Sequence, residues 1–281
     1  THELAPADGK LYGLRDVTAT VDCIPLIASS IMSKKIAAGA QVIVLDVKAG
    51  RGAFMKTEAS AVELAQVMVE IGKRVGRRVA AVIGDMSQPL GHAIGNALEV
   101  IEAIDTLKGR GPRDFYEHCL TISTQLLLLA NIVSDEQHAR DKLGTVLESG
   151  SALEKFIEWI DAQGGDSRVV NDPGLLPHAQ FVEEYPAGRS GYVAGIDALE
   201  LGMISMRLGG GREKKADPID HAVGVVLNKK VGEPIRAGET LALIHANDAA
   251  RAAQAIEQLR MAITLSETLP APPELIRRIV R

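Results

Sequence analysis

Three polar side chains near the start of the chain, Arg15, Ser30 and Lys34, could together bind one flat polar ligand. A planar guanidinium donates parallel hydrogen bonds, an ammonium adds a compact positive charge, and a serine hydroxyl both donates and accepts. The edge of a pyrimidine ring offers a carbonyl, an N–H and a second carbonyl in that order. These residue types therefore suit recognition of a pyrimidine base, although they also occur on ordinary solvated helix faces.

The surrounding sequence predicts how these side chains are positioned. The stretch ahead of Pro25 reads as extended chain or loop, whereas residues 26–37 are rich in helix formers with apolar positions at helical spacing. Residues four apart in a helix are neighbours on one face, so Ser30 and Lys34 are expected to lie together. Arg15, on the approach to this helix, is expected to fold back over the same face.

The segment 8–35 begins Asp-Gly-Lys-Leu-Tyr-Gly-Leu-Arg and ends Ser-Ser-Ile-Met-Ser-Lys-Lys. It closely resembles the signature region of the thymidine and pyrimidine-nucleoside phosphorylases, in a long and nearly gapless match. One departure adds charge near the expected cleft, because Arg51 stands where the family usually has Ser, and this bears on substrate preference. The resemblance covers essentially the whole chain and includes the segments 43–48, 52–56, 85–91, 95–100, 209–212 and 220–224.

The resemblance implies an α/β protein in three parts. Residues 1–40 would be a segment of a small α-helical domain that carries the base-binding side chains. Residues 41–172 would form a partial parallel-sheet α/β domain, and residues 173–281 a C-terminal α+β domain. The segment 231–244 has the turn pattern of small barrel modules but lacks the Met-Lys-Met hairpin of carrier domains. We therefore expect a barrel-sandwich-like structural element there.

Periodicity predicts the elements of the α/β domain. Short β-branched runs at residues 41–47 and 78–83 read as buried strands, and a crossover helix at residues 57–75 ends before Gly76. Such a unit favours a right-handed crossover and a parallel strand pair. The other expected elements are helices at residues 90–108, 115–134 and 248–264 and strands at residues 191–195, 221–227 and 238–245.

One further helix has both of its ends marked in the sequence. Ser151 and Glu154 have the spacing of a capping box, which predicts the start of a helix. The pair Gly164-Gly165 predicts its end.

The resemblance also implies an activity, the reversible phosphorolysis of thymidine, uridine or deoxyuridine in nucleoside salvage, with inorganic phosphate as co-substrate. Arg15 and Lys34 would be catalytic, because cations help most where negative charge develops on the departing base. Ser30 would contact the ring N3 position. Three further side chains are expected either to wall the base or to have an ordinary core role: Tyr12, Ile27 and Phe54.

A monovalent cation is implied as well. By resemblance, the carbonyls of Leu90 and Ala93 and the side chain of Glu102 occupy the family's potassium-type site, which residues upstream of this chain would complete. The alternative interpretation is an ordinary helix N-terminus with an exposed Glu. A zinc site is not expected, because the seven histidines show no His-Glu-x-x-His pattern and no Cys-x-x-Cys partner.

Family members begin with a helical segment, a strand and a Lys-His-Ser-Thr-Gly-Gly type loop that binds phosphate, and these 281 residues contain no such loop. We therefore expect the C-terminal portion of a phosphorylase, homodimeric by family analogy, through truncation, cleavage, an incomplete gene or a separate partner chain. Two alternatives stay open. One is a noncatalytic fragment or pyrimidine-binding module, and the other, ranked last, is a phosphorylase of nucleoside monophosphates.

The composition predicts a soluble globular protein, with 46% hydrophobic and 24% charged residues. A net charge of −5 argues against nucleic acid as the main partner, since phosphate backbones recruit basic surfaces. The two cysteines, Cys23 and Cys119, fit a reducing compartment, and no apolar run is long enough to span a bilayer. We therefore expect a cytoplasmic enzyme without a membrane partner.

Overall fold

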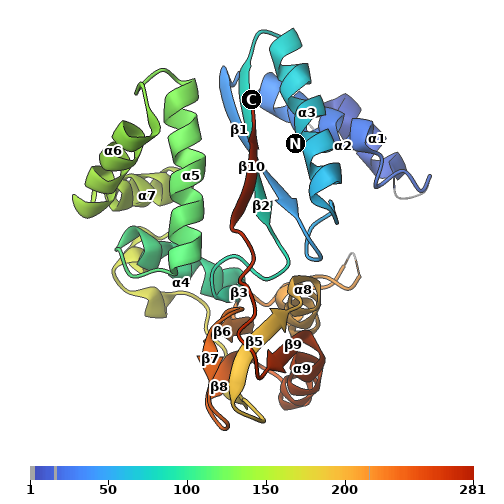
Figure 1. Cartoon of the computed structure of the whole chain (residues 1–281), viewed down its shortest axis with the longest axis vertical. Helices are drawn as coiled ribbons and strands as arrows, with labels where there is room; N and C mark the ends of the chain where they lie inside the picture. The colour runs from blue at the N-terminus through green and yellow to red at the C-terminus, as the bar shows by residue number, and fades with distance from the viewer. Residues whose placement is uncertain (1–3, 16–17, 215) are drawn as a thin grey trace. The chain divides into compact units, whose positions relative to one another are not determined.

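The computed structural model describes residues 4–15, 18–214 and 216–281 (Figure 1). The chain divides into two compact units. The first comprises Thr1–Asp85, His118–Leu143 and Glu274–Arg281, and the second comprises Met86–Glu117 and Gly144–Pro273. Each unit has a hydrophobic core of its own, and each is described by itself below.

The first unit is built on a three-stranded sheet with the order β1-β2-β10. β1 (Val42–Ala49) and β2 (Arg78–Asp85) pair in parallel, and α3 (Glu58–Arg74) connects them. β10 (Ile276–Val280) pairs with β2 in the antiparallel sense. The expected βαβ unit with its parallel strands is thus confirmed.

Strand β1 buries one face and carries polar side chains on the other. Ile43 and Leu45 are buried in the core to which α2 (Ile24–Ala37) and α3 also contribute. Because successive side chains of a strand point to opposite faces, Asp46 and Lys48 lie on the face away from that core.

The expectation of extended chain or loop ahead of Pro25 was wrong in part, because a helix, α1 (Pro6–Arg15), occupies much of that stretch. Gly9 and Gly13 lower the helix propensity of this stretch, so its sequence does not indicate a helix. Residues 16–17 lie outside the described part of the chain, and α2 begins at Ile24, one residue before Pro25.

The helix expected at residues 90–108 begins later than predicted. Residues Ala93–Gly95 form a short strand, β3, and the helix α4 spans Asn96–Leu107. Gly95 has φ +155°, and a Cβ there would lie 2.6 Å from the carbonyl oxygen of Val223. The close approach of strand β6 (Gly224–Leu227) therefore requires glycine where the sequence suggests helix.

The helix α7 (Ser151–Ala162) corrects the predicted capping box. Its N-cap is Gly150, in the left-handed region with φ +80°, and no side chain caps it. Ser151 is instead the first helical residue. The predicted end is confirmed, because the N–H of Gly165 donates to the carbonyl of Ile160 at 2.9 Å.

The helix expected at residues 115–134 is shorter than predicted. α5 (Arg113–Leu129) ends before Asn131, which has φ +58°. A separate helix that the sequence analysis missed, α6 (Glu136–Glu148), follows it.

The second unit contains two antiparallel sheets, ordered β3-β6-β8-β4 and β7-β5-β9. The described residues contain no closed barrel, and the chain as a whole is of mixed α/β class. The other elements of this unit are β4 (Phe181–Pro186), β5 (Gly191–Ile196), α8 (Ala198–Ser205), β6 (Gly224–Leu227), β7 (Pro234–Ile235), β8 (Thr240–Ala246), α9 (Ala249–Ala262) and β9 (Ile263–Ser266), with short helical turns at Ser167–Val170, Pro173–Leu175 and Met206–Gly210.

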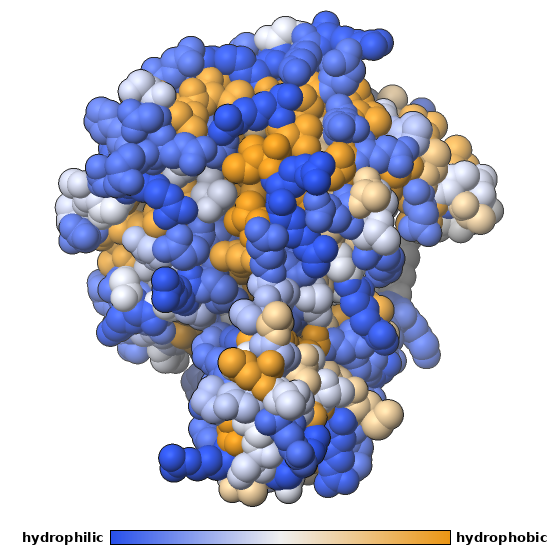
Figure 2. All heavy atoms as spheres, viewed as in Figure 1, coloured by the Kyte–Doolittle hydropathy of each residue, from blue (hydrophilic) through white to orange (hydrophobic). Residues whose placement is uncertain are grey.

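The surface drawn in Figure 2 is mainly hydrophilic and carries separate apolar patches. In the part of the chain that the structure describes, every helix is too short or too polar to cross a membrane.

Candidate functional site

Helices α1 and α2 bring a carboxylate, a hydroxyl and an ammonium together. The Nζ atom of Lys34 lies 2.5 Å from Oδ2 of Asp8, and it donates to the carbonyl and the Oγ atom of Ser30 at 2.7 and 2.9 Å. The expected pairing of Ser30 with Lys34 along one helix face is therefore present. The side chain of Lys34 is 30% exposed, which leaves its ammonium accessible from solvent.

Electrostatics tie these groups into one cluster. The hydrogen bond from Lys34 holds the pKa of Asp8 below its ordinary value, against an opposing effect of burial. A hydrogen bond from Ser30 and the positive charge of Arg15 lower the same pKa further. Asp8 is thus ionised at neutral pH and keeps the Lys34 ammonium in place.

Arg15 is the last residue of α1 and is buried. Its Nη2 atom donates to the carbonyl of Val21, and its Cζ atom lies 5.3 Å from the centroid of the Tyr12 ring. Its Nε atom is buried and has no hydrogen-bond partner among the described residues. Because an unpaired buried donor is costly, this N–H is a candidate for bonding to a ligand.

No role for Asp8 was predicted from the sequence. A local signal existed, because Asp8, Tyr12 and Arg15 are spaced at i, i+4 and i+7 and so share one face of a helix. That signal becomes visible only when the stretch is known to be helical.

The three side chains expected to wall a base have different environments. Ile27 is buried in the core of the first unit, which favours its core role. Tyr12 is 56% exposed and packs beside the Arg15 guanidinium. Phe54 is 73% exposed in the turn after β1, where the ammonium of Lys56 donates to the carbonyl of Ala53 at 2.7 Å.

The residues predicted for a cation site lie in the second unit. The Oε1 atom of Glu102, in α4, accepts from the backbone N–H groups of His92 and Ala93 at 2.7 and 3.0 Å. Burial is the main cause that raises the pKa of Glu102, and the nearby Asp114 carboxylate raises it further. Glu102 is therefore a half-buried residue within a helix, rather than an exposed residue at a helix start.

The side chain of Lys230 contacts the loop that precedes α4. This contact was not predicted from the sequence. The Nζ atom of Lys230 donates to the carbonyls of Pro89 and Gly91, the second at 2.6 Å, and lies 3.0 Å from Oδ2 of Asp114. The residue is buried, and three acceptors match its three N–H donors. Nothing in its sequence neighbourhood predicts this contact, because the loop that it binds lies about 140 residues earlier in the chain.

The oxygen atoms in the predicted set, two backbone carbonyls and the Glu102 carboxylate, are of the type that hard cations prefer. Carbonyl and carboxylate oxygens suit such ions, whereas soft metals select sulfur and imidazole ligands. Among the described residues, no group of three or more His, Cys, Asp and Glu side chains is placed to hold a metal ion. The predicted set of Leu90, Ala93 and Glu102 therefore fits an alkali cation better than a transition metal.

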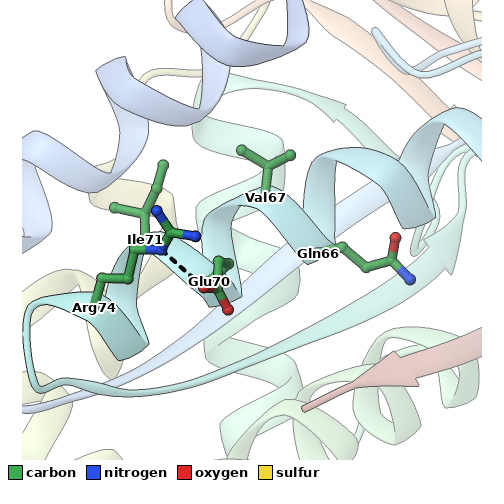
Figure 3. A pocket seen from close by; sticks show the side chains of 5 residues that line it. All are labelled: Gln66, Val67, Glu70, Ile71 and Arg74. Carbon is green, nitrogen blue, oxygen red and sulfur yellow. Dashed lines mark hydrogen bonds and ion pairs between the residues drawn. The ribbon is translucent and has the colours of Figure 1, made fainter.

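A surface pocket along α3 shares no residue with either cluster (Figure 3). Its polar groups include an ion pair between Arg74 Nε and Glu70 Oε1 at 2.8 Å, and both side chains are exposed. The pocket is lined by residues of this one helix: Gln66, Val67, Glu70, Ile71 and Arg74.

Comparison with protein families matches both ends of the chain. The glycosyl transferase family, a/b domain, matches residues 1–153, and the pyrimidine nucleoside phosphorylase C-terminal domain matches residues 192–266. The first match covers more than half of the chain. The chain belongs to this glycosyl transferase family.

Three similar proteins carry the same name. The pyrimidine-nucleoside phosphorylase of Bacillus subtilis (strain 168) is 59% identical over 244 residues, which cover 87% of this chain and 56% of the relative. The Staphylococcus haemolyticus protein of the same name has the same identity and coverage. The Staphylococcus aureus (strain USA300) protein is 53% identical over 277 residues, 99% of this chain and 64% of the relative. The chain thus spans 56 to 64% of the length of these relatives.

Proposed function

We propose that the protein is a pyrimidine-nucleoside phosphorylase, which converts thymidine, uridine or deoxyuridine and phosphate to the free base and a (deoxy)ribose 1-phosphate. The cluster of Arg15, Ser30 and Lys34 carries this proposal. It supplies two cations and one hydroxyl on a pair of adjoining helices, with Asp8 holding the ammonium. The names of the relatives support the reaction.

The residues of the cluster would divide the work of stabilising the departing base. When the glycosidic bond breaks, negative charge develops on the pyrimidine and its carbonyl oxygens. Lys34 would donate to those oxygens, as would the Nε–H of Arg15, which has no partner within the described part of the chain. Ser30 would contact ring N3. Removing one such donor costs about 3 kcal/mol of barrier, because donors that are already in place need no reorganisation.

We further propose a potassium ion held by the carbonyls of Leu90 and Ala93 and the carboxylate of Glu102. The ion would supply a fixed positive charge that holds this loop together. The supporting observation is the half-buried Glu102, whose raised pKa shows that nearby positive charge does not offset its burial. Melting temperatures in KCl and in NaCl test the proposal, and Glu102→Gln should abolish any advantage of KCl.

By analogy with the family, we propose a homodimer that acts in the cytoplasm, with a nucleoside and phosphate as its ligands. Native mass measurement would test the dimer.

The decisive experiment combines the intact mass of the native protein with an assay for free uracil and thymine. Release that depends on phosphate would support the phosphorylase. Absence of release, with uracil still bound to the cluster, would favour a noncatalytic pyrimidine-binding module. Release from nucleoside monophosphates alone would favour the third alternative.

A further inference from the structure

A second polar cluster lies on the first unit, on the face of β1 opposite its core. The Oδ2 atom of Asp46 is 2.8 Å from Nζ of Lys48 and 2.7 Å from Nε2 of His118, a residue of α5. The Nζ atom of Lys48 is also 2.8 Å from the same Nε2 atom. Three titratable groups from two elements therefore meet at one point.

The imidazole of His118 is firmly placed. It is 3% exposed, and it lies over Gly84 of β2, where a Cβ would come within 3.1 Å of its Cε1 atom. Gly84 pairs directly with Lys48 in the sheet. Any larger residue at position 84 would press on the ring, so the sheet itself keeps room for the histidine.

The distances limit how protons are shared in this cluster. If Nε2 of His118 carries a proton, Asp46 accepts from both His118 and Lys48, and the Lys48 ammonium must turn its two remaining N–H groups away from the Nε2–H group, which lies 2.8 Å from Nζ. If Nε2 is bare, it accepts from Lys48 and faces the Asp46 oxygen lone pair to lone pair, which is repulsive. The first arrangement is favoured because the ammonium can rotate its N–H groups away from the ring, whereas the carboxylate cannot remove its lone pairs. In it His118 orients Asp46, and Asp46 anchors Lys48.

Asp46 is held in the charged form that this arrangement needs. Burial alone would raise the pKa of Asp46, but the hydrogen bond from His118 and the charge of Lys48 outweigh it and lower that pKa. The Nδ1 atom of His118 is buried and has no hydrogen-bond partner among the described residues. The ring therefore depends on its Nε2 contacts for its orientation.

The position of Lys48 suggests a ligand. It lies next to the last residue of β1, at the carboxyl end of a parallel strand, where open α/β sheets bind their ligands. Its side chain is 22% exposed, so the spare N–H groups can be reached. Of the two substrates in the proposed reaction, the nucleoside is neutral and phosphate is an anion, and an ammonium is best matched to the anion.

We propose that Lys48 binds an oxygen of the phosphoryl group and that His118, acting through Asp46, is a positioning residue for the Lys48 ammonium. This inference rests on the proposed phosphorylase function. The same phosphoryl group is carried by inorganic phosphate in one direction of the reaction and by the pentose 1-phosphate in the other. Both ligands should therefore need Lys48.

The kinetic test measures substrate dependence in both directions. Lys48→Met should raise KM for phosphate, and KM for ribose 1-phosphate in the reverse reaction, by roughly tenfold or more, as expected for a lost charge-assisted hydrogen bond. KM for uridine should stay within about twofold, since that contact is made elsewhere. Lys48→Arg should restore most of the loss, and Lys73→Met, which removes an exposed lysine of α3, serves as the matched control. An unchanged KM for phosphate in Lys48→Met would overturn the inference.

Variants of His118 test the positioning role. His118→Gln keeps an N–H that can donate to Asp46 and should stay close to wild type, whereas His118→Phe should raise KM for phosphate with little change in kcat. A fall in kcat alone, or equal behaviour of the two variants, would contradict positioning. Circular dichroism and melting curves would show that each variant is folded.

A binding measurement separates this inference from the proposed function. In protein labelled with ¹⁵N-histidine, inorganic phosphate should shift the His118 resonances, and Lys48→Met should abolish that shift. If the protein binds phosphate in this way but releases no base, the inference stands and the proposed function fails. If phosphate leaves His118 unmoved, the inference fails whether or not the enzyme is active.

Discussion

Lys34 and Lys230 both pair with an aspartate and both donate to backbone carbonyl oxygen, yet their surroundings differ. The Lys34 ammonium donates to the carbonyl and hydroxyl oxygens of Ser30, one turn earlier in the same helix. The side chain of Lys34 is 30% exposed. The side chain of Lys230 is 11% exposed and binds carbonyls far away in the chain. Each ammonium has three acceptors, so exposure makes the difference between them. A buried ammonium holds structure together, whereas an accessible ammonium beside a hydroxyl can exchange a partner for a ligand.

The buried pair should dominate stability. Lys230→Met would leave the Asp114 carboxylate and the Pro89 and Gly91 carbonyls without their shared donor. Breaking a buried pair in this way costs about 3 to 5 kcal/mol of the free energy of unfolding, because one charge stays uncompensated. Urea unfolding measures it, with Lys229→Met as the neighbouring control. A loss of unfolding free energy below about 1 kcal/mol would mean that the Lys230–Asp114 pair contributes no more than an exposed salt bridge.

The accessible cluster should dominate turnover instead. Arg15→Ala or Lys34→Ala is expected to lower kcat by roughly a hundred- to a thousandfold, with little loss of stability for Lys34→Ala, since each removes a donor to the departing base. Steady-state phosphorolysis of uridine measures it, and Lys35→Ala, the exposed neighbour on α2, is the matched control. Near-normal turnover in both variants would contradict the proposal that Arg15 and Lys34 bind the departing base.

Asp8 sharpens the comparison within the first cluster. Asp8→Asn keeps the shape of the side chain but removes the charge that holds the Lys34 ammonium. We expect kcat to fall by about tenfold or less, because Ser30 still accepts from Lys34. The double variant Asp8→Asn with Lys34→Ala should be no worse than Lys34→Ala alone. Additive losses would mean that Asp8 acts independently of Lys34.

The smallest expected effect is on how the stability contributed by the Lys230–Asp114 pair depends on pH. Burial alone would raise the pKa of Asp114, but Lys230 and two backbone N–H groups bring it below the ordinary value of 3.8. A lowered pKa contributes stability that is present above the ordinary value and is lost as the pH falls through the folded-state pKa. The stability difference between wild type and Lys230→Met should therefore shrink as the pH falls below about 4. The Lys230 charge also lowers the pKa of Glu102, so losing it raises both pKa values and acts in the same direction. A difference that grew as the pH fell would therefore contradict the assignment.

Much of the fold could be predicted wherever the residues that specify a helix or strand lie within or directly beside that element. The apolar periods of β1, α3 and β2 lie within single segments, and the Thr57 cap and the Gly76 turn lie beside them. The misplaced start of α4 has a different cause. Gly95 is required by the approach of β6, which the local sequence does not contain.

The residues alone determined that Ser30 and Lys34 share a helix face, because i,i+4 geometry is a local property of the backbone. Only the tertiary structure decided that Asp8 reaches Lys34, that Lys230 fills the loop before α4, and that His118 meets Asp46 across 72 residues. Such contacts depend on how separate elements pack, and side chains of the same type are buried or accessible according to that packing. That is why the two lysines, alike in sequence, differ in their expected roles.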